Sequence, residues 1–259
     1  MGWKFRGGGF YNGIPARDLT DAEVSLLPTA LQHIVREGGR YEQSDDIEPQ
    51  PRRIETRFKN ILLVCPTYRL EPETVDRIHG QKWNRGALDF FFTRDNPHSG
   101  ETLYRNIELN MNKARQVFLK GKYDAMFIVE SDMLPPYDAL ERLAMVEADI
   151  AGGLYVMRQW EKATNAMVYD PSRGKNLSAI PLHELRGVDL VRTNGVSNGC
   201  ALIRRDVLEE VVFRAELPLP PDSAFMQDCN DAGFVTVCDT SVVCGHKCED
   251  GRVLYPELN

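Results

Sequence analysis

The feature that most constrains the fold is a set of short apolar runs without polar alternation. Residues 61–65 (ILLVC) form the clearest run and end at Pro66-Thr67. Residues 124–129 (DAMFIV) form another, and Glu130-Ser131-Asp132 follow it at once. Runs of this kind are typical of strands that are buried on both faces of a parallel sheet. The two runs therefore predict central strands with abrupt polar ends.

Helical patterns alternate with the apolar runs along the chain. The stretch after residue 102 places Leu103, Ile107 and Met111 on one amphipathic stripe, and Pro135-Pro136 is typical of the first turn of a helix. The alternation predicts a doubly wound α/β sheet flanked by helices. We expect strands over residues 61–65, 87–93, 124–129 and 149–156, and helices over residues 72–80, 103–121 and 135–148.

Residues 1–57 have a different character from the rest. Thr20-Asp21-Ala22-Glu23 has the form of a capping box, and apolar residues then recur at helical spacing as far as Gly38-Gly39. Residues 41–57 are polar and resemble a linker. We predict a small helical extension with its linker over residues 1–57 and the main domain over residues 58–259.

Composition and charge limit the classes of protein. With 259 residues, 42% of them hydrophobic, the chain can bury the core of one α/β domain with an appendage. The formal net charge of −7 disfavours non-specific nucleic-acid binding, which normally needs a basic surplus. No segment has the apolar run of a signal peptide or the ~20 apolar residues of a membrane span. We therefore expect a soluble, cytoplasmic protein.

The six cysteines are expected to be reduced thiols, several of them in the core. Cys238, Cys244, His246 and Cys248 form a cluster that offers a structural zinc site as an alternative. Their spacing differs from the paired C-x2-C arrangement that is usual in zinc knuckles and ribbons, so zinc is the less favoured interpretation.

Two polar segments stand where an α/β sheet binds its ligands, which is beyond the carboxyl ends of the strands. Pro66-Thr67-Tyr68 follow the first strand, and Glu130-Ser131-Asp132 follow the third. Two carboxylates at spacing i, i+2 after a buried strand can reach one hard cation, with a bound diphosphate completing its shell. The alternative interpretation is a solvated turn, or an aspartate that caps the next helix.

Four segments in order resemble family 2-like glycosyltransferases. ILLVCPTYRLEPETVDRI is similar to their opening strand, turn and first helix, and residues 123–158 are similar to the central segment that carries a D-x-D-type motif. GCALIRRDVLEEVVF and DSAFMQDCNDAGFVTVCDTSVVCGH resemble the C-terminal half. The resemblance covers residues 60–246 and implies a GT-A fold, with a mixed, mainly parallel sheet. FYNGIPARDLTDAEV also resembles short modules of bacteriophage-encoded proteins.

The resemblance implies a role for several residues in binding the donor. Pro66, Thr67 and Tyr68 would line the base and ribose of a nucleoside diphosphate, and Asp95 would touch the same groups. Asp132 matches the last aspartate of the D-x-D motif and would bind the metal directly. Glu130 stands where the family often has aspartate, and it would reach the metal through water or hold the ribose.

Two further positions would complete the reaction centre. His246, at the end of the last predicted strand, would be another metal ligand, which makes Mn²⁺ the first choice and Mg²⁺ the second. Asp222 would be the general base of an inverting transfer, or the N-cap of a helix over residues 223–232. Asp228 and Asp231 are alternatives for the base. Trp160, Asn198 and Gly199 are candidates for shaping the pocket.

The function implied is transfer of a sugar from a UDP- or GDP-sugar to an acceptor that the sequence leaves open: a glycan, a protein or a modified DNA base. Retaining stereochemistry also stays open. One alternative is a nucleotidyltransferase, although CPTYRLEPE lacks the glycine-rich loop usual in that class. Another is a non-catalytic phage structural or carbohydrate-binding protein on the same scaffold. No G-x-G-x-x-G follows the first strand, which disfavours hydride transfer.

Overall fold

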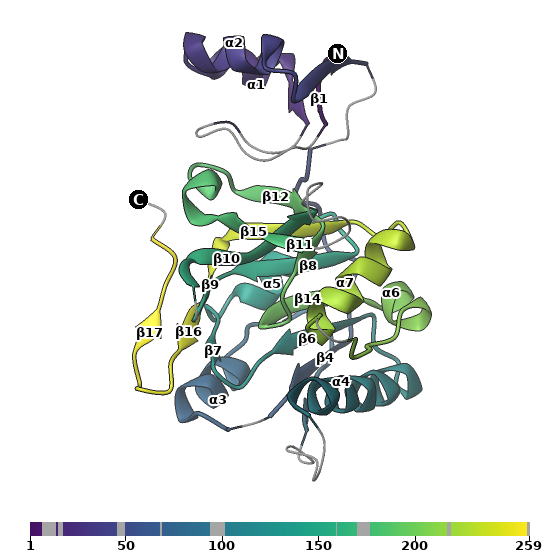
Figure 1. Ribbon diagram of the computed structural model, residues 1–259. Coiled ribbons are helices and arrows are strands. Elements are labelled where there is room, and N and C mark those ends of the chain that lie inside the picture. The colour runs from purple at the N-terminus through teal and green to yellow at the C-terminus, as the bar shows by residue number, and fades with distance from the viewer. Residues whose placement is uncertain are drawn as a thin grey trace.

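The computed structural model describes residues 1–6, 14, 18–45, 50–67, 69–93, 102–158, 160–169, 177–216 and 219–257, with side chains omitted at 160–162. A seven-stranded sheet in the order β12-β15-β8-β14-β6-β4-β5 forms its centre (Figure 1). These strands are β4 (Ile61–Cys65), β5 (Leu88–Phe92), β6 (Ala125–Val129), β8 (Ile150–Leu154), β12 (Leu190–Thr193), β14 (Cys200–Arg204) and β15 (Thr236–Val243). The four strands predicted from apolar runs are confirmed as β4, β5, β6 and β8.

The sheet is mixed and mainly parallel. Strands β4, β5, β6, β8 and β15 run in one direction, whereas β12 and β14 run in the other. Strand β14 lies between β6 and β8 and pairs with both in antiparallel register. The carboxyl ends of the parallel strands therefore meet at one edge of the sheet, where an α/β fold binds ligands.

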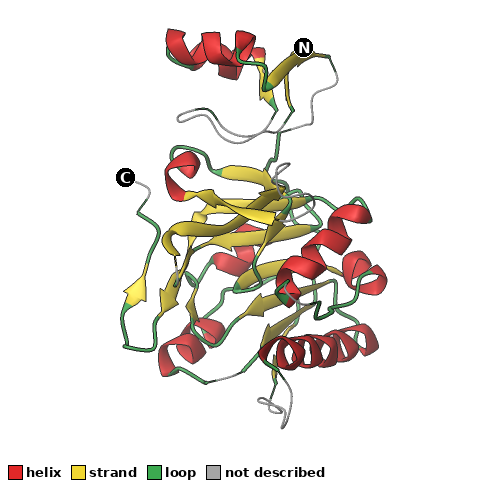
Figure 2. Ribbon diagram, viewed as in Figure 1, coloured by secondary structure: helices red, strands yellow, loops and turns green. Residues whose placement is uncertain are grey.

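Alternation along each strand divides the core into two layers. In β4, Leu62 and Val64 pack on one face, together with residues of α4 (Leu103–Lys120), α6 (Arg205–Glu210) and α7 (Pro221–Asp231). Ile61 and Leu63 pack on the other face, together with α3 (Pro72–His79) and α5 (Ala139–Ala144). Since both faces are covered by helices, the strands need no polar alternation. Figure 2 shows these helices on the two sides of the sheet.

Two small sheets adjoin the central one. The first, in the order β11-β10-β13, contains β10 (Trp160–Tyr169), β11 (Leu177–Pro181) and β13 (Gly195–Val196), and β9 (Val156–Met157) pairs with β10. The second, in the order β17-β16-β7, contains β7 (Met133–Leu134), β16 (Gly245–Lys247) and β17 (Val253–Leu254). A short 3-10 helix, η2 (Leu182–Leu185), follows β11.

The N-terminal extension contains strands as well as helices. It has β1 (Gly2–Phe5), β2 (Leu19–Thr20), α1 (Asp21–Leu26), α2 (Thr29–Glu37) and β3 (Tyr41–Ser44) around its own small core. The predicted capping box is confirmed, because Thr20 and Glu23 each bond the other's backbone N–H. The single helix predicted here is wrong, since Pro28 separates α1 from α2. The linker predicted from residue 41 is also wrong at its start, because buried Tyr41 begins β3.

A predicted helix in the main domain is also wrong. The helix expected over residues 135–148 is limited to α5, which begins at Ala139. Before it, Met133–Leu134 form β7, because a residue that precedes proline favours the extended region. The helix expected over residues 223–232 begins earlier, at Pro221, so Asp222 lies inside its first turn and the N-cap is Pro220. Among the described residues, no helix is both long enough and apolar enough to cross a bilayer.

The segment that joins the extension to the main domain is fixed by ion pairs. Arg53 donates from two guanidinium nitrogens to the carboxylate of Asp239, at 2.7 and 3.0 Å, and the Asp239 side chain is fully buried. The Arg53 backbone forms a bridge with Val146, and exposed Arg52 pairs with Glu147. The contact of Arg53 with Asp239 thus attaches this segment to strand β15 of the main sheet.

Candidate functional site

Three carboxylates gather beyond the carboxyl end of β6. Glu130 and Asp132 follow that strand directly, and Asp222 comes to them from the first turn of α7. Burial, and then repulsion from Asp132 and Asp222, raises the pKa of Glu130 to about 8. The direction of the shift reflects the cost of placing a charge in a buried position that already has two carboxylates nearby. Positive charge at this edge would offset the nearby negative charges.

His246 points its Nε2 atom at Asp132. Because β16 pairs with β7, His246 lies opposite Met133, one residue after Asp132. The His246 Nδ1 atom lies 2.9 Å from the carbonyl oxygen of Val156, which can only accept, so Nδ1 carries the hydrogen. In the neutral ring Nε2 then presents a lone pair to the Asp132 carboxylate, 3.7 Å away. Two electron-rich atoms that face each other in this way favour a positive charge close to both.

Asp132 and His246 fit a divalent cation as two of its ligands. Two ligands that each lie about 2.1 Å from one ion are at most about 4.2 Å apart, so the observed 3.7 Å allows a common ion. A backbone carbonyl that holds the other nitrogen is the usual support of a ligating histidine. Within the described part of the chain, no group of three or more such side chains is arranged to hold an ion. A site with two protein ligands suits a metal whose shell is completed by a diphosphate and water.

Arg158 contacts the same carboxylate, at the oxygen that His246 also faces. Its Nη1 atom lies 3.0 Å from Asp132 Oδ2, the oxygen that faces His246. Burial alone would raise the pKa of Asp132, but the His246 ring and the Arg158 guanidinium outweigh it and hold that pKa below its usual value. Arg158 was not among the residues predicted from the sequence. Its place directly after the fourth strand, at the ligand-binding edge, was the available signal.

A hydrogen-bonded group surrounds Asp222. Its Oδ1 accepts from the backbone N–H of Ser223 at 2.8 Å, and the Ser197 hydroxyl also bonds its carboxylate. Burial raises the pKa of Asp222 in spite of these bonds. Ser197 also contacts the phenol of buried Tyr155, which accepts from the N–H of Gly199 at 3.2 Å.

Gly199 is required for this packing. A Cβ atom at that position would lie 2.6 Å from the Tyr155 hydroxyl, so a larger residue would displace the ring. The neighbouring Asn198 is almost completely buried, and its Oδ1 atom has no hydrogen-bond partner among the described residues. Ser197, Asn198 and Gly199 thus bring polar groups close to the carboxylates. The sequence prediction included the last two but missed Ser197 and Tyr155.

Thr67 lies at the same sheet edge, after β4. Its N–H donates to the Thr93 hydroxyl at 2.8 Å, and its own hydroxyl donates to the Cys65 carbonyl oxygen at 3.0 Å. Burial, with a smaller contribution from Glu130 and Asp132, raises the pKa of the Cys65 thiol to about 12. Pro66 and Thr67 thus end β4 beside the carboxylates, where a ligand would meet them. The predicted residues Tyr68 and Asp95 lie outside the described residues, and so does the Trp160 side chain.

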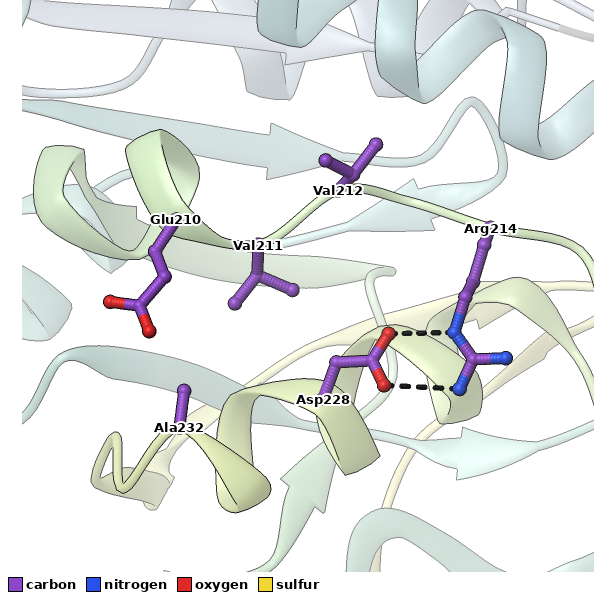
Figure 3. A pocket seen from close by; sticks show the side chains of 6 residues that line it. All are labelled: Glu210, Val211, Val212, Arg214, Asp228 and Ala232. Carbon is purple, nitrogen blue, oxygen red and sulfur yellow. Dashed lines mark hydrogen bonds and ion pairs between the residues drawn. The ribbon is translucent and has the colours of Figure 1, made fainter.

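The alternative bases and the alternative zinc site lie elsewhere. Asp228 receives two hydrogen bonds from Arg214 in a separate hollow of about 320 Å³ between α6 and α7, shown in Figure 3. Asp231 is the last residue of α7. Cys238 and Cys244 are fully buried in the core, and no zinc-type cluster is present among the residues that the structure describes.

Three solved structures are similar to this chain at low sequence identity. A197 from STIV superimposes with a TM-score of 0.52 at 16% identity, over 76% of this chain and 94% of that chain. TarS from S. aureus gives a TM-score of 0.41 at 13% identity, over 70% of this chain and 35% of that one. The inositol-1-phosphate CTP transferase from T. maritima gives 0.40 at 12% identity, over 71% and 86%. No protein-family model and no curated protein matches the sequence.

The likeness to A197 extends over nearly all of that protein and shows a common fold. Together with the sheet order, it confirms the predicted fold class, a mixed and mainly parallel GT-A type sheet flanked by helices. At this identity the likeness carries the fold alone. Membership of family 2 and a phage origin stay predictions.

Proposed function

We propose that the protein is a metal-dependent glycosyltransferase that uses a nucleoside-diphosphate sugar, with a UDP- or GDP-sugar as the donor. The observation that carries the proposal is the pairing of Asp132 with a histidine whose other nitrogen is fixed by Val156. This pair lies beside two more carboxylates at the ligand-binding edge of the sheet. The fold and the chemistry of the edge therefore agree.

Each residue at the edge has a distinct task in this proposal. Asp132 and His246 hold Mn²⁺, or Mg²⁺ as the second choice, and Glu130 binds a water of its shell or the donor ribose. When bound, the cation neutralises charge that develops on the leaving diphosphate. Pro66 and Thr67 line the nucleoside, with Tyr68 and Asp95 as further predicted contacts.

Arg158 takes a second cationic task. Its guanidinium now neutralises Asp132, and its side chain is 42% exposed, so it can leave the carboxylate when a cation takes that place. The freed guanidinium would then bind the diphosphate, for which its planar set of donors is well suited. Arg158 thus neutralises Asp132 in the free protein and would neutralise the diphosphate in the complex.

Asp222 acts as the general base of an inverting transfer. It accepts the proton of the acceptor hydroxyl, the acceptor oxygen forms a bond to the anomeric carbon, and the bond from that carbon to the diphosphate oxygen breaks. The electron pair of the broken bond leaves on the diphosphate. The raised pKa makes Asp222 a stronger base than an exposed aspartate, and Ser197 and Ser223 hold its carboxylate in place.

A thermal-shift screen tests the donor site. UDP, GDP, CDP and dTDP would each be added with Mn²⁺, Mg²⁺ or EDTA. A ligand at about 100 times its Kd stabilises the folded state by about 2.7 kcal/mol, which raises the midpoint by several degrees in a protein of this size. We expect such a shift with UDP or GDP and Mn²⁺, and we expect it to vanish in Asp132→Ala and in His246→Ala.

Exposed residues of the same types serve as matched controls. Asp45→Ala and His33→Ala, whose side chains are 91% and 67% exposed, should keep the shift. A shift that is equal in EDTA would contradict the metal, and no shift with any diphosphate would contradict the donor site. A shift with CTP in place of every diphosphate would favour the nucleotidyltransferase alternative.

A further inference from the structure

A pocket of about 790 Å³ lies beside the reaction centre, between η2, β9 and the segment of β17 that continues to Glu257. Its volume is within the range of about 300–1,000 Å³ that is usual for ligand sites. We call it the C-terminal pocket. Its wall includes Val156, Leu182, His183, Arg186, Tyr255 and Glu257.

The C-terminal pocket shares its wall with the metal-binding pair. Val156 lines the pocket, and its backbone carbonyl oxygen contacts the His246 ring. Leu254, also in the wall, pairs with His246 across the β16–β17 hairpin. Figure 1 shows this hairpin and β9 on the same side of the sheet. A ligand in the pocket would therefore lie next to the His246 position.

The pocket combines an aromatic surface with polar groups. Tyr255 is 49% exposed, and its ring packs on Gly245, where a Cβ atom would lie 2.7 Å from it. Arg186 forms no ion pair with any described residue, and Glu257 adds a carboxylate to the wall. His183 is also in the wall, with its Nε2 atom 3.2 Å from Glu184. By contrast, the hollow in Figure 3 has its arginine bound by Asp228. Of these two hollows, the C-terminal pocket is the one whose arginine has no ion pair with a described residue.

We propose that the C-terminal pocket binds the acceptor, and that this acceptor is a pyranoside. An aromatic ring gives a sugar an apolar face to lie on, while arginine, histidine and carboxylate side chains match its hydroxyl groups. The proposal rests on the proposed glycosyl transfer, because it gives the second substrate a place beside the first. It selects a glycan among the acceptor classes that the sequence left open.

Ligand-observed saturation-transfer NMR tests this proposal. The probes are the methyl pyranosides of glucose, galactose, mannose, N-acetylglucosamine and glucuronic acid, each with and without UDP or GDP and Mn²⁺. We expect at least one pyranoside to bind the wild-type protein. We expect its Kd to rise at least tenfold in Arg186→Ala and in Tyr255→Ala, and to stay the same in Arg36→Ala, a change of an exposed arginine on α2.

The nucleotide screen separates failure of this proposal from failure of the proposed function. Arg186→Ala should keep the nucleotide- and Mn²⁺-dependent midpoint shift, which shows that this variant is folded. It therefore still tests the pocket if Tyr255→Ala disturbs the hairpin. If none of the pyranosides binds, or if one binds both variants as it binds wild type, the acceptor assignment is wrong even when the nucleotide shift is present. If the nucleotide shift is absent, the donor proposal fails whatever the sugars do.

Discussion

At the scale of single residues, Asp222 combines a largely desolvated carboxylate with a position near Glu130. Its raised pKa means that it loses its proton at a higher pH than an exposed aspartate does. Only the ionised form can accept a proton from an acceptor. The pH dependence of the reaction should therefore have an acid limb set by Asp222, with the rate falling as the pH drops through that raised pKa.

Asp222→Asn should slow turnover by about 10²–10⁴-fold, because general bases contribute on that scale. The measurement is slow hydrolysis of the donor that gives the nucleotide shift, with water in place of the acceptor. The midpoint shift itself should survive, because the amide removes a base and leaves Asp132 and His246 in place.

The control for this change is Asp228→Asn on the same helix. Asp228 is bound by Arg214 and should matter little to the rate. Loss of hydrolysis in Asp228→Asn, with normal rates in Asp222→Asn, would transfer the role of base to Asp228.

Glu130 gives a prediction about stability. Its pKa is about 8 in the folded protein and 4.5 ordinarily, so the folded state keeps a proton that the unfolded chain releases above pH 4.5. The stabilisation is therefore complete below pH 4.5 and is lost as the pH rises through about 8. Glu130→Gln, which mimics the protonated form, should gain stability over wild type by up to about 1.4 kcal/mol for each pH unit in this window.

Urea unfolding at pH 5 and pH 8 in EDTA measures the difference. Exposed Glu249→Gln is the matched control and should follow the wild-type pH dependence. If Glu130→Gln and wild type keep a constant difference between the two pH values, the crowding of carboxylates inferred here is absent.

At the scale of elements, the segment before β4 is attached to β15 by one buried charge. Removal of one partner of a buried pair costs about 3–5 kcal/mol, because the other charge is left without compensation. Arg53→Ala should lower the free energy of unfolding by up to this amount, since Asp239 is fully buried while Arg53 is 35% exposed. Arg52→Ala should cost at most about 1 kcal/mol, because its pair with Glu147 is exposed.

Denaturant unfolding of the two variants provides the test. Equal losses in Arg53→Ala and Arg52→Ala would show that the Arg53 pair contributes no more than a surface contact. If neither variant lowers the free energy of unfolding, the Arg53 pair likewise contributes no more than a surface contact.

The same scale shows how far sequence patterns reach. The apolar runs predicted β4, β6 and β8 because a strand that is buried on both faces consists mostly of apolar residues. The helix expected from Pro135 failed because proline is compatible both with a first turn and with the end of a strand. What decided between them was the pairing of β7 with β16, more than a hundred residues later in the chain.

At the scale of the whole molecule, the candidate site is assembled from segments that are far apart in sequence. Motif resemblance was able to suggest Asp132, Asp222 and His246, because each stands at the end or start of an element with a recognisable pattern. It missed Arg158, Tyr155 and Ser197, which reach the site through turns. Tyr155 follows β8, Arg158 follows β9 and Ser197 follows β13, and no local pattern encodes how these three positions lie against the sheet.

The placement of His246 outside the seven-stranded sheet has an evolutionary consequence. The residue belongs to a three-stranded sheet that is held to the rest by β7 and by the contacts of Lys247 with Glu71 and Glu73. Among the described residues, the two large core clusters include Met133 of β7 but no residue of β16 or β17, so the β16–β17 hairpin can change while the central core stays intact. If the proposed transfer is right, catalysis would be easier to lose than the scaffold, and relatives with this sheet but without the hairpin histidine are expected to bind sugars without transferring them.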